Sequence, residues 1–327
     1  MNIKCAINGN FDYFFAGKKI TDENELQRIK SLVIPPAWEN VWICKLSNGH
    51  LQVTGTDIKK RKQYKYHPLW NKLRNHTKFY RMHSFGKCIA DVRLKLQEDI
   101  SLKGLPQEKV LATVVSLMES THIRIGNNFY EKLYGSFGLT TLKDKHVTIN
   151  GNQLKFSFKG KKGVMHDITL KDKKLASIVQ QCKDIPGKEL FQYYAEDGNK
   201  KAIDSGMVNN YIKTISNSDF TAKDFRTWAG SLETLLILKE LCNCETEAEK
   251  KKNIITAIDT TAKHLGNTRN VCKKYYINPV IISLYENDKL SRYIEQSENN
   301  NSKILFTKEE NILMRILESN ENNIFDN

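Results

Sequence analysis

The chain has 327 residues, of which 40% are hydrophobic and 27% are charged. This composition supplies enough apolar material for a folded core and excludes a wholly disordered chain. At about 150 residues per domain, we expect one large or two modest domains. Lys and Arg number 51 against 37 Asp and Glu, and the resulting net charge of +14 favours a polyanionic partner such as nucleic acid.

Other classes of protein are excluded by patterns that the sequence lacks. Its strongly apolar runs are short, as at residues 235–238, whereas a membrane-spanning helix needs about 20 apolar residues. The first ten residues carry no charged-then-apolar signal pattern, so we expect neither secretion nor membrane insertion. The seven scattered cysteines form no CxxC pair and no GxxxxGK(S/T) phosphate loop occurs, so we expect reduced thiols, no metal site and no ATP-driven chemistry.

The first part of the chain predicts a small β-rich domain, residues 1–76. Short β-prone runs occupy residues 11–15, 41–44 and 51–54. Asn48-Gly49, between the second and third runs, is typical of a hairpin turn. A helical pattern over residues 23–32 ends before Pro35-Pro36, because proline cannot continue a helix.

The remaining residues, 77–327, predict a larger and mainly helical domain, so the expected fold class is α+β. Helical periodicity starts at Phe85, and Pro106 begins an amphipathic segment that reaches residue 118. The turn sequence Asn150-Gly151-Asn152 lies between two alternating runs and predicts a small β-hairpin over residues 147–158. Near the end, Thr307-x-x-Glu310 is a candidate capping box for a last helix.

A protein that cuts a phosphodiester without a metal needs a nucleophile, cations for the non-bridging oxygens and an acid for the leaving group. Arginine suits the oxygens because its planar fork stays charged and binds phosphate through two hydrogen bonds. Lysine suits the acid because burial or neighbouring cations lower its pKa. Tyrosine suits a break that must be resealed, because a phenol is a better leaving group than an alkoxide.

Short motifs with side chains of these kinds occur in one order along the chain. They are Arg-Ile-Gly-Asn at residues 124–127, Gly-Ser-Phe-Gly-Leu-Thr-Thr-Leu at 135–142, Phe-Lys-Gly-Lys-Lys-Gly at 158–163, Lys-Asp-Phe-Arg-Thr-Trp at 223–228, Leu-Gly-Asn-Thr at 265–268 and Tyr-Tyr-Ile-Asn-Pro at 275–279. In this order they resemble the type IB DNA topoisomerases of the poxvirus-like group, which has viral and bacterial members. The resemblance runs from about Pro35 to Pro279, and the stretch 135–142 is its most specific part.

The resemblance implies a catalytic role for five residues. Tyr276 is the nucleophile, which forms a 3′-phosphotyrosyl link and frees a 5′-hydroxyl. Arg124 and Arg226 contact the scissile phosphate, Asn267 donates a hydrogen bond to a phosphate oxygen, and Lys161 is the general acid. Lys155, Lys159 and Lys162 are the competing lysines, of which Lys162 is the main alternative. The supercoiled duplex relaxes before resealing, with no ATP, metal or other cofactor.

The resemblance also implies DNA contacts outside the catalytic set. The segment that follows Gly55-Thr56-Asp57 matches a family stretch whose glutamine and tyrosines touch bases in the major groove, here Gln63, Tyr64 and Tyr66. The two tyrosines are two residues apart, so on a strand they share a face. Tyr130 and Lys223 are further candidate DNA contacts. We expect a monomer whose two domains clamp duplex DNA, in a bacterial cytoplasm at the nucleoid or in a virus.

Two other functions compete with this one. A tyrosine recombinase shares the chemistry, but recombinases typically have His-x-x-Arg where this chain has Lys223-x-x-Arg226, and they lack the N-terminal domain. A non-catalytic DNA-binding protein could keep the fold, but the intact catalytic set argues against it. Ordinary packing is the competing interpretation for Tyr276, Gln63, Tyr64 and Tyr66, and surface ion pairing for the arginines. We interpret His264 as a helix-end residue, and His67, His122 and His166 as packing or DNA-backbone residues.

Overall fold

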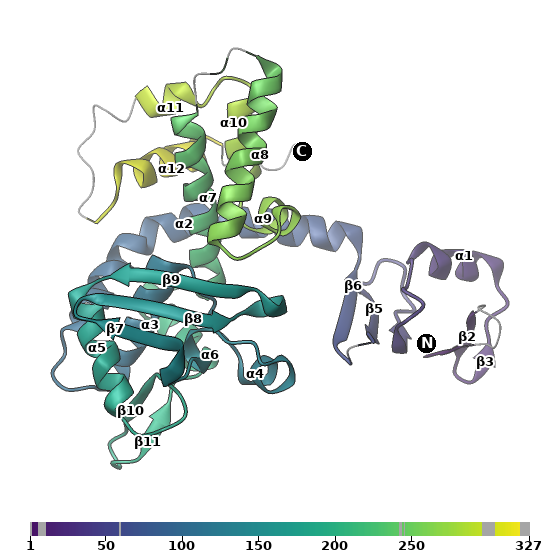
Figure 1. Cartoon of the computed structure of the whole chain (residues 1–327). Helices are drawn as coiled ribbons and strands as arrows, with labels where there is room; N and C mark the ends of the chain where they lie inside the picture. The colour runs from purple at the N-terminus through teal and green to yellow at the C-terminus, as the bar shows by residue number, and fades with distance from the viewer. Residues whose placement is uncertain are drawn as a thin grey trace. The chain divides into compact units, whose positions relative to one another are not determined.

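The computed structural model describes residues 2–5, 11–58, 60–241, 244, 246–295 and 305–320 (Figure 1). The chain divides into two compact units, Met1–Lys78 and Phe79–Asn327. The first unit is β-rich and the second mainly helical, which confirms the α+β class. No helix in these ranges has the length and apolar character that crossing a bilayer requires.

The N-terminal unit is a six-stranded antiparallel sheet with one helix, α1 (Glu23–Ser31). The strand order is β3-β2-β1-β4-β5-β6. The strands are β1 (Asn2–Cys5), β2 (Phe11–Phe15), β3 (Lys18–Lys19), β4 (Glu39–Ile43), β5 (Leu51–Thr56) and β6 (Lys62–Tyr66). The predicted strands at 11–15, 41–44 and 51–54 and the predicted helix are confirmed, whereas β1, β3 and β6 were not predicted.

The predicted pairing of the second and third runs is confirmed, but the turn between them is longer than a two-residue hairpin turn. Strands β4 and β5 are antiparallel, with Ile43 opposite Val53, and residues 44–50 connect them. Gly49 N–H donates to the carbonyl of Leu46 inside this loop. Ile43, Val53 and Val41 pack with Ile29 of α1 to form the small core of this unit.

Most of the second unit is helical. Its helices are α2 (Pro68–Ile100, which begins in the first unit), α3 (Gln107–Thr121), α4 (Asn128–Tyr134), α5 (Lys173–Asp184), α6 (Ser205–Ser216), α7 (Ala222–Glu240), α8 (Glu247–His264), α9 (Arg269–Tyr275), α10 (Pro279–Glu286), α11 (Ser291–Glu295) and α12 (Lys308–Ser319). Helix α2 begins 17 residues before the periodicity at Phe85 suggests. Its first turns leave Leu69 and Leu73 exposed, so no apolar face marks them in the sequence.

A three-stranded antiparallel sheet of β7 (Val147–Asn150), β8 (Gln153–Lys159) and β9 (Met165–Lys171) interrupts the helices. The predicted hairpin is confirmed, because Asn150 pairs with Gln153 across a two-residue turn. Strand β9 was not predicted. A second small sheet joins β10 (Gln192–Tyr194) to β11 (Lys200–Ala202), and short 3-10 turns lie at Leu139–Thr141, Asp144–His146 and Lys161–Gly163.

Helix α3 is the central element of the core of the second unit. The amphipathic segment predicted after Pro106 is confirmed, and its residues from Val110 to Met118 are buried almost throughout. The helix contacts α5, α6 and α7, as well as β9 and β10. In Figure 1 it lies behind the sheet formed by β7, β8 and β9. The chain leaves α3 through His122, whose φ of 56° turns the backbone toward Arg124.

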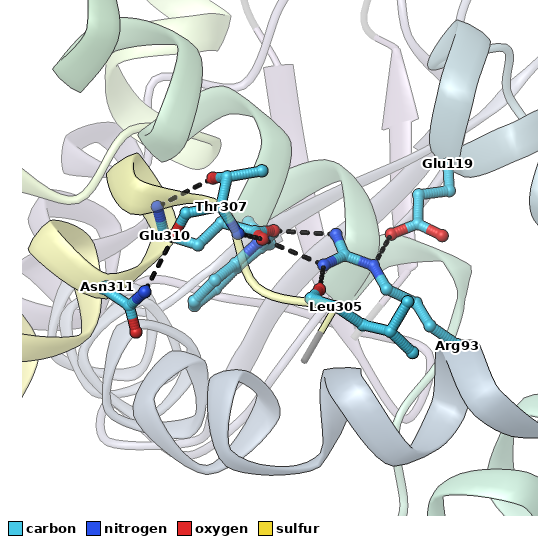
Figure 2. A network of polar contacts seen from close by, with 7 residues as sticks. Arg93, Glu119, Leu305, Thr307, Glu310 and Asn311 are labelled. Atoms are coloured by element: carbon cyan, nitrogen blue, oxygen red, sulfur yellow. Dashed lines mark hydrogen bonds and ion pairs between the residues drawn. The ribbon is translucent and has the colours of Figure 1, made fainter. Parts of the chain in front are cut away.

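The last described helix, α12, is tied into this core through its first turn. The predicted capping box is confirmed, since Thr307 Oγ1 accepts from the N–H of Glu310 and the Glu310 carboxylate accepts from the N–H of Thr307. The same buried carboxylate accepts two hydrogen bonds from Arg93 on α2, at 2.7 and 2.9 Å (Figure 2). It also accepts one from Trp228 Nε1 on α7, at 3.1 Å.

Candidate active site

The backbone that carries Arg124 is held by the stretch 135–142. The N–H of Leu139 donates to the Arg124 carbonyl at 2.9 Å, and the N–H of Thr140 donates to the Ile125 carbonyl at 2.7 Å. A Cβ at Gly138 would lie 2.4 Å from the Arg124 oxygen, so this approach requires glycine. The most specific motif of the sequence therefore supports the first catalytic candidate instead of supplying one.

The Arg124 side chain reaches the loop that follows α8. Its Nη2 donates to Asn267 Oδ1 at 2.6 Å and to the Gly266 carbonyl at 2.9 Å. The other side-chain atom of the amide, Asn267 Nδ2, is buried and has no hydrogen-bond partner within the described ranges. A buried donor without a partner is costly, so this amide group is prepared to donate to an anion.

Arg226 lies on α7 and is only 5% exposed. Its guanidinium donates to the carbonyl of His122 and, at 2.7 Å, to the carbonyl of Leu265. Its Nε is buried without a partner among the described residues. The guanidinium carbon lies 5.3 Å from the centre of the Tyr276 ring, a cation–π distance.

Tyr276 follows the last residue of α9, and its backbone is held by α7. Its N–H donates to the carbonyl of Cys272, and its own carbonyl accepts from Ser231 Oγ at 3.2 Å. Ser231 Oγ in turn accepts from the N–H of Asn278 at 3.0 Å. A Cβ at Gly230 would lie 2.7 Å from the backbone carbonyl oxygen of Tyr276, so this close approach also depends on glycine. Helix α7 therefore positions both Arg226 and Tyr276.

Lys161 lies in the turn between β8 and β9. The turn closes through a hydrogen bond from Gly160 N–H to the Val164 carbonyl, at 2.7 Å. The next residue, Lys162, has a φ of 61°, so the two lysines occupy different backbone conformations. Desolvation of its ammonium group and the charge of Arg124 lower the pKa of Lys161, while Tyr276 opposes the shift. Lys161 is thus electrostatically coupled to the arginine and the tyrosine.

The electrostatics of these residues favour a bound anion. Burial first, and then the charge of Arg226, lower the pKa of Arg124 to about 10. Burial likewise lowers the pKa of Arg226. In the described ranges neither arginine nor Lys161 forms a salt bridge with a carboxylate. Within the described part of the chain these three cations therefore lack a carboxylate counter-ion, and a phosphate group would relieve their mutual repulsion.

The catalytic candidates that the sequence indicates are thus brought together from separate parts of the chain. Hydrogen bonds and ring contacts join Arg124 to Asn267 and Arg226 to Tyr276. Electrostatic interactions connect Lys161 with both arginines and with Tyr276. Among the described residues, no three His, Cys, Asp or Glu side chains gather as a metal ion would require.

The candidate DNA contacts lie elsewhere. Tyr64 and Tyr66 are on β6 of the N-terminal unit, with their rings stacked 6.3 Å apart at an angle of 15°, so they share a face. Gln63 instead donates through its amide to Asp57, at 2.9 Å. Tyr130 is 51% exposed on α4, and Lys223 is exposed in the first turn of α7.

Sequence reasoning missed the residues that position the catalytic set. Gly230 and Ser231 hold the Tyr276 backbone, and Gly266 lies against Arg124 and His166. The Gly230-Ser231 pair inside a leucine-rich helical pattern was a usable signal, because a glycine in a helix usually has a packing reason. Nothing in the local sequence indicates which distant segment packs there.

Comparison with known proteins agrees with this arrangement. Residues 60–304 match the family model described as eukaryotic DNA topoisomerase I, catalytic core, and residues 10–57 match the bacterial DNA topoisomerase IB N-terminal domain. DNA topoisomerase 1B of Acanthamoeba polyphaga mimivirus is 31% identical over 283 residues, which cover 84% of each chain. DNA topoisomerase 1B of vaccinia virus (strain Copenhagen) is 26% identical over 281 residues, 81% of this chain and 83% of the relative.

The family match covers most of the chain, and the alignment with the mimivirus relative covers 84% of that relative's length. The matched range spans the positions of both arginines, the lysine turn, Asn267 and Tyr276. The chain belongs to the type IB DNA topoisomerases, the isomerases that relax supercoiled duplex DNA by breaking and resealing one strand.

Proposed function

We propose that Tyr276 is the nucleophile of this topoisomerase and that Arg124, Arg226, Asn267 and Lys161 form the rest of its catalytic set. The observation that carries the proposal is a pair of buried donors, Asn267 Nδ2 and Arg226 Nε, that have no hydrogen-bond partner among the described residues. The Arg226 guanidinium also lies over the Tyr276 ring. Donors of this kind are suited to the non-bridging oxygens of a phosphodiester, where negative charge grows in the transition state.

In the proposed cleavage step, Tyr276 Oη gives its proton to solvent water and attacks the phosphorus. A phosphorus–oxygen bond to tyrosine forms as the bond to the 5′ oxygen breaks. Arg124, Arg226 and Asn267 hold the non-bridging oxygens, and Lys161 gives its proton to the departing 5′ oxygen. Religation runs the same path backwards, with neutral Lys161 removing the proton from the 5′-hydroxyl. The phosphotyrosyl bond conserves the energy of the broken bond, so resealing needs no ATP.

Lys162 is the alternative acid, because it lies in the same turn. The coupling of Lys161 to Arg124 and Tyr276 favours Lys161. Lys162 has a left-handed backbone conformation, which a non-glycine residue rarely adopts, so the two lysines are not equivalent positions of the turn. A comparison of Lys161→Ala with Lys162→Ala in single-turnover cleavage separates the two, and a larger defect in Lys162→Ala would reverse the assignment.

We propose that residues 1–76 form a DNA-binding domain and residues 77–327 the catalytic domain. The stacked, partly exposed rings of Tyr64 and Tyr66 present one face of β6 to bases, while Tyr130 and Lys223 contact the duplex from the catalytic domain. Base contacts select sites and phosphate contacts do not. A double Tyr64→Ala/Tyr66→Ala variant should therefore change the map of cleavage sites, and an unchanged map would make these tyrosines structural.

Every member of the proposed catalytic set comes from one chain, so we propose that the enzyme acts as a monomer. Its proposed place of action is with the DNA it relaxes, at a bacterial nucleoid or with a viral genome. Light scattering during turnover on plasmid DNA tests whether the active enzyme is a monomer. A mass of two chains in the active species would contradict it.

The experiment that tests the whole proposal is relaxation of a negatively supercoiled plasmid in EDTA without ATP. We expect full relaxation, and rapid denaturation with SDS should trap protein on the 3′ side of each nick. DNA labelled at either end distinguishes 3′ from 5′ attachment. A requirement for a divalent metal ion or ATP, or attachment to the 5′ end, would contradict the proposed chemistry.

A further inference from the structure

His166 on β9 contacts both segments that carry the catalytic lysine and asparagine. It pairs with Phe158 across β8 and β9, and the two rings stack at 5.0 Å and 16°. A Cβ built on Gly160 would lie 2.5 Å from His166 Cδ2, and one built on Gly266 would lie 2.6 Å from Cε1. The outer edge of the imidazole therefore packs directly against the Cα hydrogens of two glycines.

The two glycines come from different parts of the chain. Gly160 precedes Lys161 in the turn between β8 and β9, and Gly266 precedes Asn267 in the loop after α8. The position of a Gly266 Cβ is also 3.5 Å from Arg124 Nη1. The imidazole is thus a wedge between the lysine turn and the segment that binds Arg124.

The hydrogen bonds that close the lysine turn are internal to it. Gly160 N–H donates to the Val164 carbonyl and Gly163 N–H donates to the Gly160 carbonyl. These bonds shape the turn. The end of β8 is also tied to the stretch 135–142, because the Lys159 carbonyl accepts from Phe137 N–H at 2.8 Å. Beyond this bond, the His166 ring joins the turn to the loop after α8 by packing on both Gly160 and Gly266.

We propose that His166 is a positioning residue that sets the distance of the Lys161 turn from the phosphate-binding groups. This inference rests on the proposed role of Lys161 as general acid. A flat ring passes between two backbones where a branched side chain would not, and its stacking on Phe158 prevents it from swinging out. A displacement of about 1 Å in a catalytic group can cost about a hundredfold in rate, so the wedge affects proton transfer to the 5′ oxygen.

A second observation fits the wedge. Burial and the charges of Arg124 and Arg226 lower the pKa of His166, so the ring is neutral when the enzyme works near neutral pH. A neutral ring adds no further charge to a cluster that already holds two arginines and a lysine. A lysine or arginine in its place would repel that cluster.

The test uses two DNA substrates that differ only in the bridging atom at the scissile bond, oxygen or sulfur. A thiolate leaves with little help from an acid, so a defect confined to proton transfer disappears on the sulfur substrate. We expect His166→Ala to slow single-turnover cleavage of ordinary DNA by about 10- to 100-fold and to cleave the sulfur substrate at close to the wild-type rate. Asp167→Ala, at the exposed neighbouring position of β9, is the matched control and should behave as wild type on both.

Gly160→Ala provides a second variant with an intact imidazole. Alanine can adopt the φ of −91° found at Gly160, so the added methyl group should not strain the backbone. It should act by displacing the His166 ring, which it would otherwise overlap. We expect the same sulfur-rescued defect. Adding Gly160→Ala to His166→Ala should then cost little more, because the ring that the methyl group displaces is already gone.

The outcomes separate this inference from the proposed function. The positioning role of His166 would be overturned if His166→Ala were slowed equally on both substrates, or if it cleaved ordinary DNA at the normal rate. In either case, rescue of Lys161→Ala by the sulfur substrate would still support Lys161 as the general acid. Failure of the sulfur substrate to rescue Lys161→Ala would overturn the acid assignment and the inference with it. Additive defects of Gly160→Ala and His166→Ala would show that the methyl group does not act through the ring, and would also overturn the inference.

Discussion

Tyr275 is the last residue of α9 and Tyr276 follows it, and the surroundings of the two rings differ. The Arg226 guanidinium lies 5.3 Å from the centre of the Tyr276 ring, whereas the ammonium of Lys274 lies 5.6 Å from the centre of the Tyr275 ring. Tyr276→Phe removes only the hydroxyl, so we expect it to bind DNA normally and to form no covalent adduct. SDS trapping on labelled DNA measures this, with Tyr275→Phe as the matched control. If Tyr276→Phe still formed the adduct, or if Tyr275→Phe lost it, Tyr276 would not be the nucleophile.

The two arginines should differ in what their loss costs. Removing one donor to a charged transition state typically slows the chemical step by about 10²- to 10³-fold, so Arg124→Ala and Arg226→Ala should both do so in single-turnover cleavage. Arg226 holds two backbone carbonyls, those of His122 and Leu265, whereas Arg124 holds one, that of Gly266, so the Arg226 variant should melt at the lower temperature of the two. Arg269→Ala, which breaks only an exposed pair with Asp259, should leave both quantities unchanged. Wild-type cleavage by either active-site variant would exclude that arginine from catalysis.

Lys161 should give the reaction a pH dependence of known sign. Its pKa is lowered, so it loses its proton at a lower pH than an ordinary lysine does. An acid must be protonated to act, so cleavage of ordinary DNA should slow as the pH rises through this lowered pKa. Religation needs the neutral amine and should accelerate over the same range. The decrease of the cleavage rate with rising pH should be missing in Lys161→Ala. If the decrease persisted in that variant, the titration would belong to another group.

At the scale of elements, α12 is held by the buried carboxylate of Glu310. Figure 2 shows that Arg93 of α2 bonds to both Glu310 and Glu119, the latter on α3. Trp228 of α7 also donates to Glu310, so three other helices share one polar network with α12. Glu310→Gln keeps the size of the side chain but leaves Arg93 with one partner fewer. We expect the free energy of unfolding to fall by about 2 to 3 kcal/mol in denaturant titration.

Glu309→Gln is the matched control on the same helix. Glu309 pairs with Lys239 at 3.2 Å at a half-exposed position, so its loss should cost below about 1 kcal/mol. Arg93 lowers the pKa of Glu310 in spite of burial, so its stabilising charge is present above the ordinary glutamate pKa and lost as the pH falls. The difference between wild type and Glu310→Gln should therefore shrink in acid. Equal stabilities of the two proteins at neutral pH would contradict the network's role.

Helix α7 supports several parts of the candidate site at once. Within three turns it carries Arg226, the indole that donates to Glu310, and the Gly230-Ser231 pair beneath Tyr276. Arg226 and the backbone of Tyr276, the proposed nucleophile, are therefore held by the same helix. The network at Glu310 secures that support from the opposite side of the helix.

At the scale of the whole molecule, the net charge of +14 should dominate DNA binding. Phosphate contacts release counterions, so for roughly six contacts the affinity should drop by about three orders of magnitude between about 50 and 200 mM salt. Plasmid relaxation should speed up at moderate salt, because the enzyme leaves relaxed DNA sooner. Fluorescence anisotropy with a short duplex measures the affinity, and a flat response to salt would contradict binding through phosphates.

Much of the fold could be predicted where an element buries one face. Helix α3 is buried almost throughout and the β7–β8 hairpin carries a strong turn signal, so both were found in the sequence. The first turns of α2 and strand β9 were missed. The first turns of α2 leave Leu69 and Leu73 exposed and therefore carry no apolar periodicity. In β9 only Ile168 and Leu170 are apolar residues that pack against the core, which is too short an alternation to stand out.

The sequence by itself determined the family of this protein and indicated the groups proposed to react. The arginines, the lysine turn, Asn267 and Tyr276 stand in short motifs whose order indicates the family, because the proposed reaction needs side chains of these kinds. Only the tertiary structure decided how these groups are held. Ser231, His166 and Glu310 act on segments between about 45 and 220 residues away, and such contacts depend on packing that no local pattern encodes.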